Sequence, residues 1–350
     1  MRIINNLNYM GKELKLGLPY MGSKRKLSKR IVDRILQDNP DCKYVYDLFG
    51  GGGAISFELL QRPQIKKVIY NELNTGITEL LKDIQQNGIT EKYYQWIDRQ
   101  TFNENKDKDD WFGGFCKCLW SFGNSQKAYL FGKEIEPIKK VATELIVNKD
   151  INKIEELYTL IGLRIPEDVL NLETIQERRL FVSNFIKKNK AISATTPLQY
   201  VENISRVQQL ERLEQLEIQN KSYSDVTMET PIEETIIYLD PPYLNTAKYA
   251  EDVNQQELSE YIKKSPYKIY LSSYDCGLKV VEEFKHNSSL ANGKNNQVIE
   301  KLFIHEPGDK EEYLKEFKNT NKKTTNKKHI CPVCQVYTDE NGNCKFCDKM

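Results

Sequence analysis

The stretch that decides the fold is KYVYDLFGGGGA, residues 43–54. Residues 44–46 are aromatic or apolar and predict a buried β-strand, which Asp47 follows directly. Four glycines stand at residues 50–53, and a helix-like segment covers residues 55–60. A glycine turn between a strand and a helix lets the backbone approach a ligand closely and points helix N-terminal amides at it. The sequence therefore predicts an α/β protein with a ligand site at this turn.

These glycines do not form a dinucleotide fingerprint. Counted from Gly50 or Gly51, the third glycine position falls on Ile55 or Ser56, so a nicotinamide cofactor is disfavoured. Asp47 instead suits a cofactor with an amino-acid moiety, because the ammonium group of such a cofactor needs a carboxylate.

Two further pieces fit an adenosine cofactor. The strand predicted at residues 67–71 ends in Glu72, where an acid can bind the two ribose hydroxyls. Asn74, next to it, could equally cap a helix. Upstream of the glycine turn stand Tyr20 and Lys24, and Lys24 could pair with a cofactor carboxylate.

The residues Asp240, Pro241, Pro242 and Tyr243, here called the amine-binding loop, follow the apolar run at residues 236–239. Proline fixes φ near about −65° and has no N–H, so the loop offers carbonyl acceptors without competing donors. Asp240 and a proline carbonyl can accept both hydrogens of an exocyclic amine while Tyr243 stacks on the ring. The target would be adenine or cytosine. The simpler alternative is a strand that ends in a Pro-Pro turn.

In this order, these motifs resemble the Dam-type N6-adenine DNA methyltransferases of the α group, over roughly residues 18–305. The resemblance implies a Rossmann-like, doubly wound sheet with an antiparallel late strand, which binds S-adenosylmethionine. The family commonly has Trp where Tyr20 stands and often Asp where Glu72 stands. The implied cofactor-binding residues are Tyr20, Lys24, Asp47, Phe49, Gly50, Gly51, Gly52, Gly53, Glu72 and Asp240.

The resemblance also implies methyl transfer to the N6 amine of an adenine that has left a specific double-stranded DNA sequence. A cognate restriction endonuclease is a further partner that it suggests. The amine nitrogen is a poor nucleophile, and acceptors at Asp240 and Pro241 would free its lone pair. The alternatives are an N4-cytosine methyltransferase, which more often has Ser at the position of Asp240, an RNA or protein-amide methyltransferase, and a non-catalytic DNA-binding zinc protein.

The strand pattern predicts the domain organisation. Residues 1–95 and 205–308 would form the catalytic domain, with further strands at 216–220, 235–239 and 268–272 and an antiparallel one at 298–304. Leucine and valine spacing predicts an amphipathic helix over 206–216.

Residues 96–204 show no strand–helix alternation and are predicted to be an inserted, mainly helical target-recognition domain. Within it, residues 120–126 and 129–133 combine aromatic, amide and glycine residues that suit the reading of base edges, although the aromatic side chains could simply be core.

The overall composition fits a soluble, cytoplasmic, monomeric protein. The net charge is +1, so a DNA site must come from local segregation of charge. Residues 24–30 hold five basic side chains and no acid, and residues 185–190 are a second basic run, although an isolated run is usually a solvated face. No apolar stretch is long enough to span a membrane.

The C-terminus predicts a separate module. Residues 309–328 read as a flexible linker, since residues 318–328 hold five lysines and no acid. Residues 329–350 then carry two C-x2-C pairs, which predict a structural zinc ribbon, with disulfides as the alternative. The predicted zinc ligands are Cys331, Cys334, Cys344 and Cys347. The other cysteines (Cys42, Cys116, Cys118 and Cys276) read as ordinary buried thiols.

Overall fold

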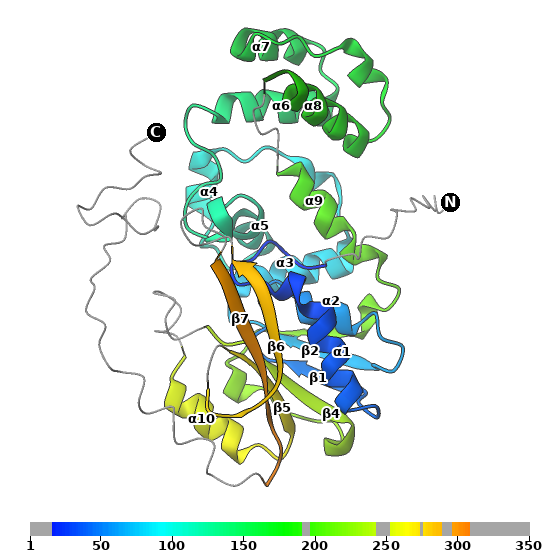
Figure 1. Cartoon of the computed structure of the whole chain (residues 1–350). Helices are drawn as coiled ribbons and strands as arrows, with labels where there is room; N and C mark the ends of the chain where they lie inside the picture. The colour runs from blue at the N-terminus through cyan, green and yellow to red at the C-terminus, as the bar shows by residue number, and fades with distance from the viewer. Residues whose placement is uncertain (1–15, 191–196, 243–252, 274–275, 289–295, 309–350) are drawn as a thin grey trace, which may run out of the picture.

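The computed structural model describes residues 16–190, 197–242, 253–273, 276–288 and 296–308. Within them lies a seven-stranded sheet with the order β3-β2-β1-β4-β5-β7-β6 (Figure 1). The first five strands in this order are parallel, β7 is antiparallel to β5, and β6 is antiparallel to β7. The strands are β1 (Tyr44–Asp47), β2 (Lys67–Asn71), β3 (Leu216–Gln219), β4 (Thr235–Leu239), β5 (Lys268–Ser273), β6 (Lys279–Ser288) and β7 (Asn296–His305).

Alternate residues of the central strands face opposite sides of the sheet, as strand geometry requires. Val45 and Ile236 belong to one buried apolar cluster, and their neighbours Tyr46 and Ile237 belong to another. Helices supply the rest of each cluster, so both faces of the sheet are covered, as expected for a parallel sheet. The first cluster includes residues of α1 (Ser28–Asp38), α2 (Ala54–Leu59), α3 (Thr75–Asn87) and α5 (Trp111–Leu119), and the second includes residues of α10 (Gln255–Lys264).

In the described residues between α3 and β3, the regular elements are α-helices and 3-10 turns, apart from a single bridge between Ser121 and Tyr129. The first part of this segment packs on the sheet, because Phe102 and Phe115 belong to the same cluster as Val45. Its remaining helices are α4 (Arg99–Asn105), α6 (Glu136–Asn148), α7 (Asn152–Ile161), α8 (Ile175–Lys190) and α9 (Leu198–Ser205).

Helices α6, α7 and α8 have an apolar cluster of their own and lie far from the sheet, at the top of Figure 1. Helix α9 joins the two parts, because Leu198 belongs to the cluster of α6–α8 whereas Ile204 belongs to the cluster on the sheet. The helical character of this segment was expected, and the domain boundaries at residues 96 and 204 stay predictions.

The prediction of a helix over residues 206–216 is wrong. The structure has two short 3-10 turns there, Val207–Gln209 and Leu213–Gln215, with Leu210 extended between them. The apolar residues Val207, Leu210, Leu213 and Leu216 recur every three residues, a spacing that fits 3-10 turns as well as an α-helix. The side-chain amide of Gln85 donates to the carbonyl oxygens of Leu213 and Leu216 at 2.9 and 2.7 Å.

The predicted strands lie within one or two residues of β1–β5 and β7, including the antiparallel direction of β7. Strand β6 was not predicted. A register shift between Val280 and Glu282 breaks its alternation, and two adjacent acids, Glu282 and Glu283, obscure the pattern further. Such a bulge places an extra residue in one strand and removes the strict period of two.

Helices α3 and α5 approach each other through glycines. A Cβ at Gly114 would lie 1.9 Å from the carbonyl oxygen of Gly76, which is too close for any side chain. We expect Gly114→Ala to lower the free energy of unfolding by about 2–3 kcal/mol, despite the better helix propensity of alanine. Urea unfolding measures this, with Gln86→Ala on the exposed face of α3 as the control. A Gly114→Ala protein as stable as that control would contradict the close contact.

Several predicted features lie outside the described residues: the linker, the zinc-ribbon module with Cys331, Cys334, Cys344 and Cys347, and Tyr243 of the amine-binding loop. Cys42, Cys116, Cys118 and Cys276 are buried, as predicted, and form no disulfide in the part of the chain that the structure describes. Burial raises the pKa of Cys42, Cys116 and Cys118 to about 12. Among the helices described, none has the length and apolar character that a membrane span needs.

Candidate active site

The candidate site lies where the strand order reverses. From β1 the chain crosses to β2 on one side, whereas β4 pairs with β1 on the other side. In open parallel sheets, ligands bind outside the carboxyl ends of the strands at such a switch point. Asp47 ends β1 opposite Tyr238, and Asp240 follows two residues later at the end of β4. The two acids, far apart in sequence, therefore share one edge of the sheet.

The glycine turn is shaped by packing within the protein. A Cβ at Gly50 would lie 2.1 Å from the ring of Tyr70, and one at Gly52 would lie 2.7 Å from the carbonyl oxygen of Leu18. Gly51 and Gly53 have φ values of +49° and +73°, which disfavour other residues. The Tyr70 hydroxyl donates to the Gly51 carbonyl at 2.6 Å. Packing and backbone conformation therefore explain why glycine stands at all four positions, without any contribution from a ligand.

The segment before the turn lies against it. The Leu18 amide donates to the Gly52 carbonyl at 2.8 Å, and the Tyr20 ring would lie 3.2 Å from a Cβ at Gly51. Tyr20 is half-buried. The structure thus brings the predicted residue Tyr20 to the glycine turn.

Asp47 has one carboxylate oxygen satisfied and one not. Its Oδ2 accepts a hydrogen bond from the Ser56 hydroxyl at 2.7 Å, whereas its Oδ1 has no hydrogen-bond partner among the described residues. The side chain is 1% exposed. Burial raises the pKa of Asp47 to about 7, which the Ser56 hydrogen bond only partly offsets, and the charges of Asp240 and Glu72 add to the increase. A buried acceptor without a donor fits the ammonium group of an amino-acid moiety.

Glu72 is held by backbone amides on both sides. Its Oε2 accepts from the Gly51 amide and its Oε1 from the Asn74 amide, both at 2.9 Å. One amide of the glycine turn therefore binds Glu72, although the sequence predicts that the amides of this turn point at a ligand. Burial raises the pKa of Glu72, against the opposite effect of these hydrogen bonds. Asn74 does cap α3, since its side chain accepts from the Ile77 amide at 3.4 Å.

The ammonium group of Lys24 lies between two carboxylates. Lys24 Nζ is 2.6 Å from Asp240 Oδ1 and 3.2 Å from Glu300 Oε1, and the side chains of Lys24 and Glu300 are 5% and 6% exposed. Burial by itself would lower the pKa of Lys24, but the attraction of Asp240 and Glu300 outweighs it, so the pKa lies above its ordinary value. The structure thus shows Lys24 bound to protein carboxylates, and its predicted role toward a cofactor carboxylate stays a prediction.

Three residues of the amine-binding loop are described. Asp240 and Pro242 are half-buried, and Pro241 is buried. Strand β4 is tied to β5 just before the loop, because the hydroxyls of Tyr238 and Ser272 lie 2.7 Å apart. The loop therefore begins from a fixed point on the sheet.

Sequence reasoning missed Asn71, which connects two loops at the site. Its side-chain amide donates to the carbonyls of Leu48 and Lys221 at 3.2 and 3.0 Å, and its oxygen accepts from the Lys221 amide at 3.0 Å. Phe49 then meets Tyr223 with ring centroids 5.2 Å apart. The sequence feature that could have identified Asn71 is its amide side chain at the last position of a mainly apolar strand.

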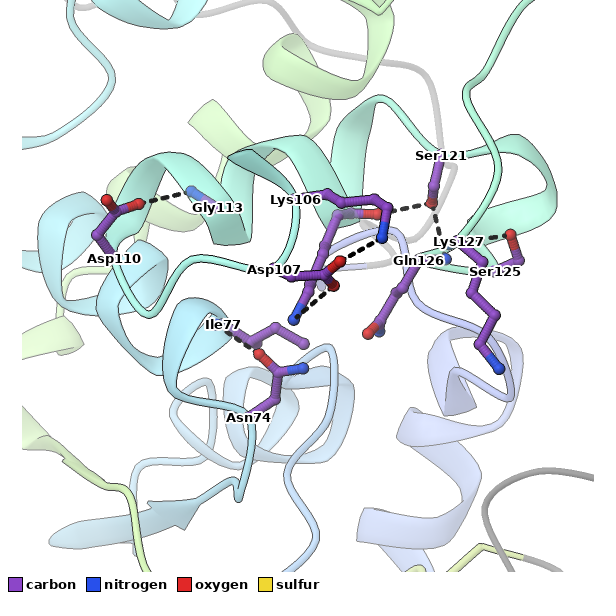
Figure 2. A network of polar contacts seen from close by, with 11 residues as sticks. Asn74, Ile77, Lys106, Asp107, Asp110, Gly113, Ser121, Ser125, Gln126 and Lys127 are labelled. Atoms are coloured by element: carbon purple, nitrogen blue, oxygen red, sulfur yellow. Dashed lines mark hydrogen bonds and ion pairs between the residues drawn. The ribbon is translucent and has the colours of Figure 1, made fainter. Parts of the chain in front are cut away.

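The segment at residues 120–131 is partly core and partly surface. Trp120 and Tyr129 are buried, so the alternative reading as core is correct for them, whereas Phe122 is 41% exposed. Gln126 has a φ of +62°, and its backbone amide donates to the Ser121 hydroxyl at 3.1 Å. Figure 2 shows this polar network together with the start of α3 at Asn74. For the surface residues of this segment, contact with DNA bases stays a prediction.

The basic run at residues 24–30 does not form a single charged face. Lys24 is buried against Asp240 and Glu300, and Arg30 pairs with Glu282 at 3.2 Å while its guanidinium lies 4.7 Å from the centre of the Phe284 ring. In the part of the chain that the structure describes, no group of three His, Cys, Asp or Glu side chains is arranged to hold a metal ion.

Comparison with known proteins adds one finding to this geometry. The sequence profile of a family described as "D12 class N6 adenine-specific DNA methyltransferase" matches residues 20–312. The match includes Tyr20, the glycine turn, Glu72 and the amine-binding loop. No curated protein sequence matches the chain.

Proposed function

Because the chain belongs to the D12 class N6 adenine-specific DNA methyltransferases, we propose that it methylates adenine N6 at the crevice between β1 and β4. Asp240 and the Pro241 carbonyl would accept the two hydrogens of the amine, and Tyr243 would stack on the base. Since this amine is paired inside a duplex, the adenine must leave the helix to reach the loop. The target would be a specific double-stranded sequence, and a cognate restriction endonuclease is a further proposed partner.

The observation that carries this proposal is the placement of two acids with different environments at one sheet edge. Asp47 is fully buried with a free oxygen, and Asp240 is half-buried and bound through Oδ1 to Lys24. The first suits a fixed ammonium group and the second an amine that arrives from solvent. The donor and acceptor sites would thus lie on neighbouring strands.

The residues that would hold S-adenosylmethionine fit its functional groups. The free Oδ1 of Asp47 suits the ammonium group, and Glu72 at the tip of β2 suits the ribose hydroxyls. Tyr20, Phe49 and the glycine turn would line the same pocket. The bound cofactor supplies the methyl group on a positively charged sulfur.

The role of Asp240 follows from the electronic structure of the amine. The lone pair of adenine N6 is delocalised into the ring, and acceptors for both hydrogens favour a pyramidal nitrogen with a localised lone pair. The nitrogen would bond to the methyl carbon as the carbon–sulfur bond of the sulfonium breaks to leave a neutral thioether, and it would lose one proton, for which the Asp240 carboxylate is the proposed acceptor. Fixed placement of the amine contributes much of the rate, because it replaces an encounter in solution.

Duplex DNA would be read by the segment between α3 and β3. The exposed aromatic side chain of Phe122 and the half-buried amide side chain of Asn124 are the groups that can enter a groove or fill the space of a displaced base. The outer helices α6–α8 would extend the contact surface.

A radiolabel experiment tests the function. The full chain is incubated with methyl-labelled S-adenosylmethionine and mixed-sequence duplex DNA, the DNA is digested to nucleosides, and the labelled base is identified. Label in N6-methyladenine is the expected result. Label only in cytosine would select the N4-cytosine alternative, and unlabelled DNA would contradict both.

We also propose that the C-terminal module holds one structural zinc ion through Cys331, Cys334, Cys344 and Cys347. The proposal depends on the spacing of the two C-x2-C pairs. We expect close to one zinc per chain by plasma mass spectrometry, and loss of most of it in a Cys331→Ser, Cys334→Ser variant. Cys116→Ser, which removes a buried thiol of α5, is the control and should keep its zinc. Full-length protein without zinc would contradict the module.

A further inference from the structure

Gln126 has a backbone conformation that its residue type disfavours. Its φ is +62°, in the left-handed region that few residues other than glycine, asparagine and aspartate adopt. The loop that contains it, residues 122–128, also has positive φ values at Gly123 and Asn124, but those residue types tolerate this conformation. The loop sequence therefore suits its backbone at 123 and 124 and opposes it at 126.

The conformation of Gln126 is not that of a helix cap. Lys149, the other non-glycine residue with positive φ outside this loop in the described chain, ends α6, and its amide donates to the Leu145 carbonyl at 3.2 Å, as is common at helix ends. The amide of Gln126 instead donates to the Ser121 hydroxyl at 3.1 Å, and this hydroxyl donates to the Lys117 carbonyl of α5 at 2.6 Å. A side chain therefore holds Gln126 in its unfavourable conformation.

The carboxamide of Gln126 is unfavourable for a second reason. Its nitrogen Nε2 is buried and has no hydrogen-bond partner among the described residues, and the residue is 9% exposed. A buried donor without an acceptor destabilises a fold, whereas an apolar side chain of similar size would not. Two independent features of one residue thus lower the stability of the free protein, and such features persist mostly at positions with a functional role.

The side chain of Gln126 points toward the start of α3. Figure 2 shows it extending to the side where Asn74 is drawn, whereas Ser125 and Lys127 extend the other way. Helix α3 begins shortly after Glu72, the acid at the tip of β2. The carboxamide therefore lies on the side of the loop that is nearer the candidate active site.

We propose that Gln126 is a specificity-determining residue for DNA, whose carboxamide nitrogen donates to a ring nitrogen or carbonyl oxygen of a base when a duplex binds. Because Nε2 is covered in the free protein, residues 122–128 change conformation to bring it to the base. This change relieves the unfavourable φ and gives the donor its acceptor, so the complex with DNA recovers both losses of stability. The inference rests on the proposed DNA-methyltransferase function and assigns part of its sequence preference to one donor.

The test is Gln126→Met, which keeps the length of the side chain but removes the donor. The full chain methylates mixed-sequence duplex DNA, and sequencing of the methylated positions gives the ratio of the rates at the preferred sequence and at its closest variants. We expect this ratio to fall about 5–10-fold, the effect of losing one hydrogen bond, with an unchanged KM for S-adenosylmethionine. Tm should rise or stay level, because a buried donor without an acceptor has been removed.

Gln126→Asn separates the backbone from the donor. Asparagine tolerates a positive φ and retains an amide nitrogen, so this variant should gain stability and keep more of the sequence preference than Gln126→Met does. The matched control is Gln61→Met, which makes the same change at an exposed glutamine between α2 and β2 and should leave the preference unchanged.

A sequence preference of Gln126→Met within about twofold of that of the unmodified protein would overturn the inference, because the loss of one hydrogen bond exceeds this. So would a preference that falls together with Tm and with the affinity for S-adenosylmethionine, since Gln126 would then be structural. If the unmodified protein methylates no adenine, the proposed function itself is wrong. The two failures are therefore distinguishable.

Discussion

Asparagine in place of Asp240 will lower the single-turnover rate of adenine methylation by about a thousandfold, in the range that loss of one catalytic acceptor gives in other enzymes. The carboxamide presents an N–H where the amine needs an acceptor, and it cannot take up the proton that the nitrogen loses. Lys24 would also lose its closer partner, which lies 2.6 Å away. Rapid-quench measurement with saturating S-adenosylmethionine and DNA reports this step directly.

The control for Asp240→Asn is Asp41→Asn, which makes the same chemical change at an exposed residue just before β1, at the opposite end of the strand from Asp47. It should methylate DNA at the normal rate. Both variants should bind duplex DNA with similar affinity in fluorescence anisotropy. If Asp240→Asn keeps more than a tenth of the rate while folded, the proposed role of the amine-binding loop is wrong.

The affinity for S-adenosylmethionine should rise about tenfold per pH unit between pH 5 and pH 7. Burial raises the pKa of Asp47 to about 7 in the free protein, so the group is protonated at lower pH, whereas a cofactor ammonium needs the ionised form. Above pH 7 the affinity should level off, and it should fall above about pH 8 as the cofactor amine loses its proton. Titration calorimetry at pH 6 in two buffers of different ionisation enthalpy should show release of close to one proton.

Asp47→Asn isolates this effect. It should weaken cofactor binding about 10–100-fold at pH 7.5, the usual effect of losing a hydrogen bond to a charged group, and it should remove the pH dependence below pH 7. Because the folded pKa of Asp47 lies above the unfolded value, the carboxyl group destabilises the free protein progressively from about pH 4 to pH 7 and fully above pH 7. The variant should therefore unfold at higher urea concentration than the unmodified protein at pH 8. Pronounced pH dependence in the variant would assign the effect to another group.

Strands β1, β2 and β4 were predictable because each is a mainly apolar run followed by an acid or ending in one at the sheet edge, namely Asp47, Glu72 and Asp240. Chain order alone then implied that these acids meet. The helix predicted over 206–216 was wrong because a spacing of three between apolar residues is also the period of the 3-10 turns that the structure has there.

Polar contacts between residues that are distant in the sequence could not be predicted either. Lys24 read as a basic residue among others, and Glu300 as one acid in a late strand, because only the β6–β7 hairpin brings Glu300 to Lys24. Ser56 likewise gave no signal as the hydroxyl that binds Asp47. The zinc ligands and Tyr243 remain predictions from their motifs.

The outer helices have their own apolar interior, with Leu145, Leu157 and Val182 among its buried side chains. Among the residues that the structure describes, α9 and the half-buried Tyr94 are what this interior shares with the interior on the sheet. Outward-facing positions of α6–α8 can therefore vary through evolution without disturbing the crevice between β1 and β4. If these helices contact DNA as proposed, surface substitutions alone would change the recognised DNA sequence while the residues of the crevice stay the same.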